Sequence, residues 1–229
     1  MCGRFVASTP VSALAQFFDS DIPSFETAAN FNVAPTMPIV ALRQDAAGRH
    51  LDRFIWGLSM PGKTAGENRP PVINARAESV AEKPTFRGLI ASHRCVVPVT
   101  GYYEWRTTKA SKKKIPFYIH DPNGLPLALA GLWRPRAVSP LVEGEVCIVT
   151  VEANAALAEI HNRMPAVLEL EEVDTWLNSG PTEALGLLDP ADDDRLVAEQ
   201  VSVRVNSVRN NDPTNIEPVE EQLEPSLFD

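Results

Sequence analysis

Cysteine and histidine are scarce in this 229-residue chain, and their spacing argues against two kinds of site. The chain has three cysteines and four histidines. An odd number of cysteines without a Cys-x-x-Cys pair argues against a disulfide framework and against a zinc site. We therefore expect no metal and no other cofactor. Cys95 and Cys147 lie in apolar segments, and we expect them to be inert core thiols.

Long hydrophobic runs are also missing. No apolar run approaches the ~20 residues that a transmembrane helix needs, and Arg4 stands where a signal peptide would begin its apolar segment. With 44% hydrophobic residues, the chain can still bury the core of one domain. We expect a soluble monomer without membrane contact, located in the cytoplasm and associated with the nucleoid if the organism is bacterial.

Basic residues are rare in the second half of the chain. Residues 1–136 hold 17 Lys and Arg against 10 Asp and Glu, whereas residues 137–229 hold 4 against 20. The two balances, +7 and −16, add to the net charge of −9. Such asymmetry is a hint of a face that binds a polyanion. The lysines of residues 109–114 are more simply explained as a solvated loop, so the isolated arginines beside the motifs are the better candidates.

The hydrophobic pattern predicts a compact, strand-rich α+β domain over residues 1–229. From residue 210 the chain is polar and proline-containing, which predicts a loosely held acidic tail over residues 210–229. Strands are predicted at 39–43, 51–58, 94–98, 115–120, 125–133, 146–151, 166–170 and 201–208. Helices are predicted at 9–18, 86–93, 153–160, 170–178 and 192–199, and loops at 20–38 and 59–71.

The first five residues, Met1-Cys2-Gly3-Arg4-Phe5, place a cysteine directly after Met1. Removal of Met1 would leave an α-amine and a thiol on adjacent carbons. Such a 1,2-aminothiol captures aldehydes, because the amine forms a Schiff base and the thiol then closes a thiazolidine ring. Ordinary pKa values of about 7.7–8 for the amine and about 8.5 for the thiol leave both partly reactive at neutral pH.

Three further residues could complete a site for aldehyde capture. Glu104 lies between large aromatic residues, where a charge is costly unless it is paired or used. Asn74 follows a short apolar run, and His161 follows a predicted helix. Taken singly, the asparagine could cap a turn, the glutamate could pair with an arginine and the histidine could face a helix dipole. Taken together, the carboxylate could move protons and the imidazole could assist imine chemistry.

Arginines accompany these candidates. Arg4, Arg76 and Arg163 each lie within two residues of one of them. A guanidinium group binds phosphate through two parallel N–H donors. Three arginines around a reactive pocket therefore indicate a phosphate-bearing substrate.

Five separated motifs resemble the SRAP family, whose name stands for SOS response-associated peptidase. They occur in the order of the family and cover nearly the whole domain, to about residue 206. The motifs are Cys-Gly-Arg-Phe after Met1, Asn-Val-Ala-Pro at 32–35, Ile-Asn-Ala-Arg-Ala-Glu at 73–78, Arg-Cys-Val-Val-Pro and Gly-Tyr-Tyr-Glu-Trp at 94–105, and His-Asn-Arg-Met-Pro at 161–165.

The resemblance implies an SRAP-type fold and the covalent capture of abasic sites in single-stranded DNA. The ring-opened abasic sugar presents an aldehyde, which Cys2 would convert to a thiazolidine. Glu104 would move protons during ring opening and reversal of the crosslink. His161 would support the Schiff base, and Asn74 would orient the N-terminus or the sugar. A slow strand-cleaving lyase activity and the self-removal of Met1 are implied as well.

The resemblance also implies a DNA-binding set. The three arginines would hold flanking phosphates, Trp105 would support the pocket or stack near the lesion, and Thr150 matches a site-lining threonine. The complete predicted set is Arg4, Pro35, Arg76, Trp105, Thr150 and Arg163. One part of the family pattern is missing. Residues 56–63 read Trp-Gly-Leu-Ser-Met-Pro-Gly-Lys and lack the second tryptophan with which relatives stack or wedge DNA.

Two other functions stay open. An N-terminal-nucleophile cysteine peptidase or amidohydrolase would use the Cys2 thiol and an oxyanion hole. A non-enzymatic binder of single-stranded DNA would use only a basic groove and aromatic side chains. Only aldehyde capture needs the α-amine and the thiol together.

Overall fold

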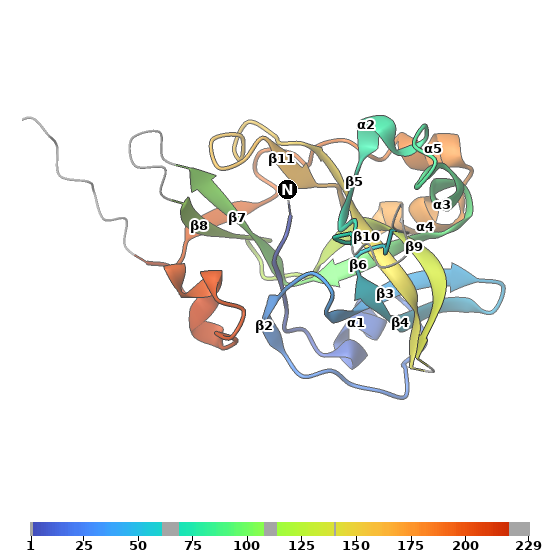
Figure 1. Ribbon diagram of the computed structural model, residues 1–229, viewed down its shortest axis with the longest axis horizontal. Helices are drawn as coiled ribbons and strands as arrows, with labels where there is room; N and C mark the ends of the chain where they lie inside the picture. Colours follow the sequence, from blue (N-terminus) through green and yellow to red (C-terminus); the bar gives the residue numbers. More distant parts are fainter. Residues whose placement is uncertain (1, 61–68, 108–113, 140, 220–229) are drawn as a thin grey trace, which may run out of the picture.

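The structure is a computed structural model that describes residues 2–60, 69–107, 114–139 and 141–219. Two β-sheets meet along the N-terminal strand, and short helices cover the outside of the larger sheet (Figure 1). The strand-rich α+β fold that the sequence predicts is confirmed.

The larger sheet closes on itself. Within the described residues, β10 pairs with β9 along one edge and, in parallel, with β4 along the other. Strands β3 and β6 complete the ring, so the order β10-β4-β3-β6-β9 forms a barrel. The barrel strands are β3 (Pro38–Asp45), β4 (Gly48–Trp56), β6 (Arg94–Val99), β9 (Leu127–Ser139) and β10 (Val142–Glu152). Three short strands pair with it, β5 (Asn74–Arg76), β11 (Arg163–Pro165) and β12 (Val167–Leu168).

The smaller sheet has the order β13-β8-β7-β1-β2. Its strands are β1 (Phe5–Ala7), β2 (Asn30–Val33), β7 (Gly101–Thr107), β8 (Lys114–His120) and β13 (Val197–Gln200). Only Thr100 separates β7 from the barrel strand β6, so one nearly continuous length of chain passes from one sheet to the other. At the crossing, a Cβ atom on Gly101 would lie 2.5 Å from Cε2 of Tyr118 and 2.7 Å from the carbonyl oxygen of Ile119. This close approach requires glycine.

Helices α3 and α4 pack against the barrel strand β6 and end at a buried arginine. Arg94 donates hydrogen bonds to the carbonyl oxygens of Ile90 in α3, at 2.7 Å, and of Trp176 in α4. These bonds satisfy carbonyl groups that lack partners at the end of a helix. The helices are α1 (Val11–Phe17), α2 (Ala77–Val80), α3 (Arg87–Ser92), α4 (Val173–Asn178) and α5 (Pro181–Leu185), with 3-10 turns η1 (Leu170–Glu172), η2 (Val203–Asn206) and η3 (Pro213–Ile216).

The first helix is capped from a distance. The sequence predicts a helix over 9–18 with proline at its first position, but Pro10 is the N-cap residue of α1. The cap comes from Glu26, whose carboxylate accepts hydrogen bonds from the backbone N–H groups of Val11, at 2.9 Å, and Ser12, at 3.0 Å. Glu26 lies in the segment 20–38 that was predicted as a loop, and that segment also contains β2.

Three predicted elements in the second half are wrong. Residues 155–160 form turns rather than a continuous helix, with Asn154 capping them by accepting from the backbone N–H of Leu157 at 3.0 Å. The last residues of the predicted helix 192–199 belong instead to β13, which pairs with β8 at the edge of the smaller sheet. Tertiary strand pairing overrides a weak helix preference there. The predicted strand 201–208 contains the 3-10 turn η2, which Ser202 caps.

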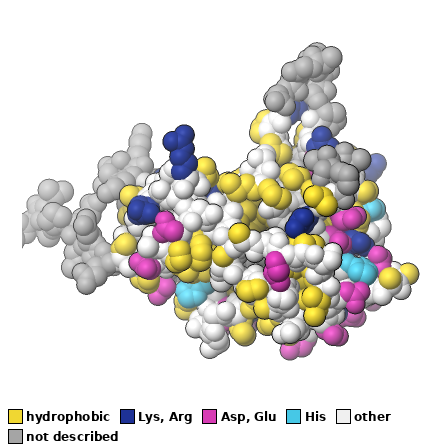
Figure 2. Space-filling model, turned by 90° about the horizontal axis from the view of Figure 1, so that it is seen from below, with side chains coloured by type: hydrophobic (Ala, Val, Ile, Leu, Met, Phe, Trp, Pro, Cys, Tyr) yellow, Lys and Arg dark blue, Asp and Glu magenta, His cyan; other side chains and the backbone are white. Residues whose placement is uncertain are grey.

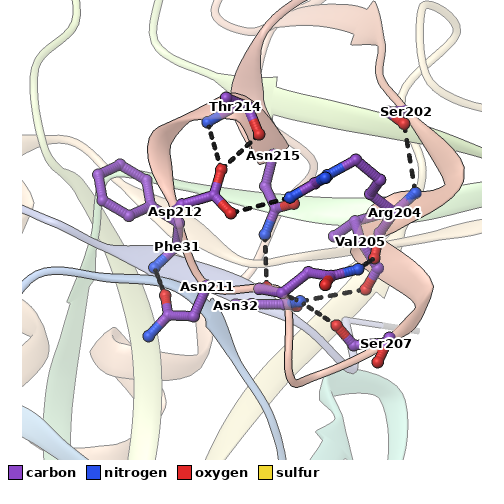
Figure 3. A network of polar contacts seen from close by, with 11 residues as sticks. Phe31, Asn32, Ser202, Arg204, Val205, Ser207, Asn211, Asp212, Thr214 and Asn215 are labelled. Carbon is purple, nitrogen blue, oxygen red and sulfur yellow. Dashed lines mark hydrogen bonds and ion pairs between the residues drawn. The ribbon is translucent and has the colours of Figure 1, made fainter.

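The described part of the predicted tail is packed against the domain. Figure 3 shows Asn32 of β2 facing this segment, and its Nδ2 atom lies 2.9 Å from the carbonyl oxygen of Ser207 and 2.7 Å from that of Asn210. The buried Asn215 donates to the carbonyl oxygen of Asn210 at 2.7 Å. Residues 210–219 are therefore held in place, contrary to the prediction, and residues 220–229 lie outside the described chain.

Substitution of Gly101 tests the crossing between the sheets. We expect Gly101→Ala to lower the free energy of unfolding by about 1–3 kcal/mol, because the added methyl group overlaps Tyr118 and the Ile119 backbone. Gly88→Ala in α3 is the control, because its Cβ would meet nothing within 4 Å. It should leave stability unchanged or raise it by up to about 1 kcal/mol. Urea unfolding measures both, and equal stabilities would contradict the close-approach argument.

Candidate active site

Cys2 lies at the junction of the two sheets. It lies three residues before the start of β1, and its exposed fraction is 0%. The Asn74 side chain, from β5 next to the barrel, donates from Nδ2 to the carbonyl oxygen of Cys2 at 2.8 Å. In Figure 1 the N-terminal end lies beside β11 and between β7 and β5. The backbone of Cys2 is thus attached to the larger sheet, while the residues that follow it belong to the smaller one.

Strand β7 places Glu104 beside Cys2. Phe5 pairs with Tyr102, and the backbone N–H of Tyr103 donates to the carbonyl oxygen of Arg4 at 2.9 Å. The antiparallel register therefore brings Glu104 level with the residues before β1. Glu104 is only 4% exposed. The Cys2 thiol and the Glu104 carboxylate are close enough to interact electrostatically.

This environment keeps the Cys2 thiol protonated. Burial raises its pKa well above the ordinary value, and the negative charge of Glu104 raises it further. The backbone N–H of Arg4 lowers it by a smaller amount through a hydrogen bond. In the chain that retains Met1, the pKa of this thiol therefore lies above the ordinary value used in the sequence analysis. The thiol reacts only when a base removes its proton or when it transfers the proton during the reaction.

Tyr102 is a site residue that sequence reasoning missed. Its side chain is fully buried, and its hydroxyl group forms no hydrogen bond with any described residue. Burial raises its pKa, and the charges of Cys2 and Glu104 raise it further. The missed signal is the period of two along a strand, which puts Tyr102 and Glu104 on the same face of β7.

Three neighbouring strands carry other predicted site residues. Asn74 and Arg76 lie on β5, Thr150 on β10 and Arg163 on β11. In the register of these strands Thr150 pairs with Arg76 on one side and with Pro165 on the other. The buried Oδ1 atom of Asn74 accepts no hydrogen bond from the described part of the chain. Asn74 therefore has a free acceptor near Cys2 in addition to the donor that holds the Cys2 backbone.

Arg163 is held by protein groups. It is 8% exposed and forms an ion pair with Glu78, with Nη1 2.5 Å from Oε1 and Nη2 3.1 Å from Oε2. Its Nη2 atom also donates to the carbonyl oxygen of Thr150 at 2.5 Å. Its backbone N–H donates to Nδ1 of His161 at 3.0 Å. Arg76, in contrast, is exposed, and its side chain forms no hydrogen bond or ion pair within the described residues, although its charge helps to lower the pKa of Glu78.

The remaining predicted DNA-binding residues lie elsewhere. Arg4 donates from Nη1 to Oδ1 of Asn32 at 2.7 Å and to the carbonyl oxygen of Val205 at 3.0 Å. Trp105 packs with the cluster on the other face of β7 from Glu104, and its Nε1 donates to Asn206 at 2.8 Å. Pro35 lies in the turn after β2. The structure does not bring these three side chains to Cys2, and their role in DNA binding stays a prediction.

Two cavities of about 520 Å³ differ in character. One adjoins the candidate site and is polar, with lining residues Arg76, Glu78, Ser79, Lys83, Glu152, Asn162 and Arg163. The other is largely apolar and lies between β1, α1, β2 and β3. On the face seen in Figure 2, hydrophobic side chains are interspersed with charges of both signs. The apolar cavity contains none of the predicted site residues.

Neither a metal site nor a membrane-spanning helix is found in the described residues. No group of three or more His, Cys, Asp or Glu side chains in them is placed to hold a metal ion. None of their helices is long and apolar enough to cross a bilayer.

The motifs and the geometry agree with a known family. The sequence model of the SOS response associated peptidase (SRAP) family matches residues 1–208. The chain belongs to this family. It is 36% identical over 225 residues to the abasic site processing protein YoqW of Bacillus subtilis, covering 95% of this chain and 99% of YoqW. It is 33% identical over 186 residues to the abasic site processing protein YedK of Escherichia coli, covering 77% of this chain and 79% of YedK.

The fold is shared with a solved structure. A crystal structure of a protein from Bacteroides thetaiotaomicron superposes with a TM-score of 0.79 at 26% identity. The match covers 95% of this chain and 100% of that one. This agreement supports the barrel, the second sheet and the position of the N-terminal strand between them.

Removal of the Glu104 charge should make the Cys2 thiol more acidic. In Glu104→Gln, the pH at which alkylation of Cys2 by iodoacetamide reaches half of its maximum should move down, because a neighbouring negative charge disfavours the thiolate. Mass mapping separates Cys2 from Cys95 and Cys147. The same midpoint in both proteins would show that Glu104 does not act on the thiol. Glu199→Gln, on β13, is the charge-matched control.

Proposed function

We propose that the protein captures abasic sites in single-stranded DNA by forming a covalent bond through Cys2. The observation that carries the proposal is the placement of Cys2, which Asn74 holds through its carbonyl oxygen beside the buried Glu104. Membership of the SRAP family and similarity to proteins named for abasic site processing support it. DNA is therefore the proposed partner, and the cytoplasm is the proposed location.

The first proposed step frees the amine. Hydrolysis of the peptide bond between Met1 and Cys2 releases Met1 and leaves the α-amine next to the thiol. Self-processing in this sense agrees with the word peptidase in the family's description. The Nδ2 contact of Asn74 with the Cys2 carbonyl oxygen does not depend on Met1, so the processed N-terminus keeps its anchor.

The amine then reacts before the thiol. The aldehyde of the ring-opened sugar adds the amine, loses water and becomes a Schiff base. The thiol, kept neutral by its raised pKa, adds its sulfur to the imine carbon. The thiol proton leaves and the former imine nitrogen gains one, which gives the thiazolidine. Glu104 is the proposed carrier of protons in sugar-ring opening and ring closure.

The Schiff base also accounts for the proposed slow lyase activity. Loss of a proton from the sugar carbon next to the imine, followed by departure of the 3′-phosphate, breaks the strand. Ring closure by the thiol removes the imine and therefore competes with this cleavage. Arg76 is the best placed arginine to contact a phosphate at the site, because it is exposed and has no hydrogen bond or ion pair with another described residue.

A peptidase acting on other proteins is the alternative. It would need the thiolate as nucleophile, which the raised pKa of Cys2 disfavours. Aldehyde capture tolerates a neutral thiol, because the amine makes the first bond. The two functions separate when the α-amine is blocked and the thiol is left free, since only aldehyde capture is then abolished.

The decisive test uses a single-stranded oligonucleotide with one abasic site. We expect a protein–DNA adduct that survives heat and denaturant, contains residue 2 and is absent in Cys2→Ala. Cys95→Ala is the matched control, because Cys95 is an equally buried thiol without an adjacent amine, and it should form the adduct. Protein verified by mass to lack Met1 that gives no adduct would overturn the proposal.

A further inference from the structure

The ion pair between Glu78 and Arg163 unites an exposed carboxylate with a buried cation. The Glu78 side chain, on α2, is 52% exposed, whereas that of Arg163, on β11, is 9% exposed. Both oxygens of the carboxylate face the guanidinium group, which is the two-pronged geometry that fixes orientation as well as distance. The hydrogen bond from Arg163 is the main reason that the pKa of Glu78 is lowered.

A second contact completes the clamp on Arg163. Its Nη2 atom donates to the carbonyl oxygen of Thr150 at 2.5 Å and lies 3.3 Å from Oγ1 of the same residue. The guanidinium group is thus held by α2 on one side and by β10 on the other. A side chain fixed in this way also restrains the backbone that carries it.

That backbone holds His161. The N–H group of Arg163 donates to Nδ1 of the imidazole at 3.0 Å. A backbone N–H can only donate, so Nδ1 accepts in this contact, and the proton of the neutral ring is then on Nε2. The other contact of Nδ1, in which it would donate to the carbonyl oxygen of Arg163, is longer at 3.3 Å. The backbone N–H of Ala153, at the end of β10, also donates to the carbonyl oxygen of Asn162 at 3.2 Å. The turn 161–163 therefore fixes both the position and the tautomer of the histidine.

We propose that Glu78 is a positioning residue that acts through Arg163 to keep His161 in the Nε2–H form within the site. This inference rests on the proposed function and on the role that the family resemblance implies for His161, which is to support the Schiff base. An Nε2–H group can donate a hydrogen bond to the hydroxyl group that leaves as water when the amine and aldehyde condense. Arg163 then serves mainly to organise the site, and Arg76 is left as the phosphate contact.

A competing explanation makes the opposite prediction. If Glu78 only occupied Arg163 and repelled DNA, its neutralisation would free a cation, tighten DNA binding and speed the reaction. If Glu78 positions His161, its neutralisation leaves binding unchanged or slightly tighter but slows the covalent step. The two explanations thus differ in the sign of the effect on the rate.

The experiment compares wild type, Glu78→Gln and Glu152→Gln. Glu152 lines the same cavity, is exposed and has no ion pair with a described residue. It lies opposite Arg163 in the pairing of β10 with β11, so its substitution removes an equal charge next to Arg163 but no contact of the guanidinium group. Binding is measured with an oligonucleotide that carries a tetrahydrofuran analogue of the abasic site, which has no aldehyde. The first-order rate of adduct formation is measured with the authentic abasic oligonucleotide at saturating protein.

We expect Glu78→Gln to lower the first-order rate of adduct formation by about tenfold. This is less than the ~10²–10⁴-fold that a complete general acid–base group supplies. Its dissociation constant for the analogue should stay within about twofold of wild type or tighten. Glu152→Gln should crosslink at the wild-type rate or faster. Nitrogen NMR of the His161 ring should show the Nε2–H form in wild type and a mixture of tautomers in Glu78→Gln.

Each failure has a separate meaning. A wild-type rate in Glu78→Gln, or an unchanged His161 spectrum in it, would overturn the positioning role while the proposed function stood. A faster reaction in both variants would favour the repulsion explanation. Absence of the adduct from wild type itself would overturn the proposed function and, with it, the inference.

Discussion

The attachment of the N-terminal residues to both sheets is the constraint on which the site depends. Asn74 holds the carbonyl oxygen of Cys2 from the larger sheet, and β1 pairs with β7 in the smaller one. Because the contact runs through the backbone, it places the α-carbon of Cys2, and therefore its amine and thiol together, whatever their protonation state. A flexible N-terminus would lose this advantage, since ordering even a few residues costs about 1–2 kcal/mol each.

In the proposed reaction, burial at this junction favours an amine that reacts before the thiol. A buried thiol beside the Glu104 carboxylate is a poor thiolate, which disfavours cysteine-peptidase chemistry and suits a thiol that adds second. The effect of the carboxylate on the charged form is opposite for the amine, because a nearby carboxylate stabilises a protonated amine but destabilises a thiolate. Glu104 therefore favours the protonated form of both the amine and the thiol, and each group must lose one proton in the proposed reaction. A single base between them can accept both in turn, which links the two halves of a thiazolidine-forming reaction.

The sequence predicted the elements whose pattern is local and failed where long-range contacts decide. The apolar run of β6 and the helices at 86–93 and 170–178 were found because their own residues specify them. The predicted strand 201–208 was wrong because Ser202 caps a 3-10 turn there. The predicted helix 153–160 was wrong in that residues 155–160 form turns after the Asn154 cap. The packing of residues 210–219 could not be foreseen, since it depends on Asn32, which lies far away in the sequence. Of the site, the motifs supplied Cys2, Asn74 and Glu104 but missed Tyr102.

Proximity in sequence to a candidate residue did not predict which arginine side chains are available to bind phosphate. Arg4, Arg76 and Arg163 each lie near a candidate residue, and all three could have bound phosphate. In the structure Arg4 joins β1 to Asn32 and η2, and Arg163 joins α2 to β10, so both guanidinium groups already have acceptors. A phosphate that bound either would compete with hydrogen bonds already formed, which offsets part of the gain, although Nε of each has no partner in the described residues. The Arg76 side chain has no hydrogen bond to a described residue, and we expect an exposed cation of this kind to contribute most to the encounter with DNA.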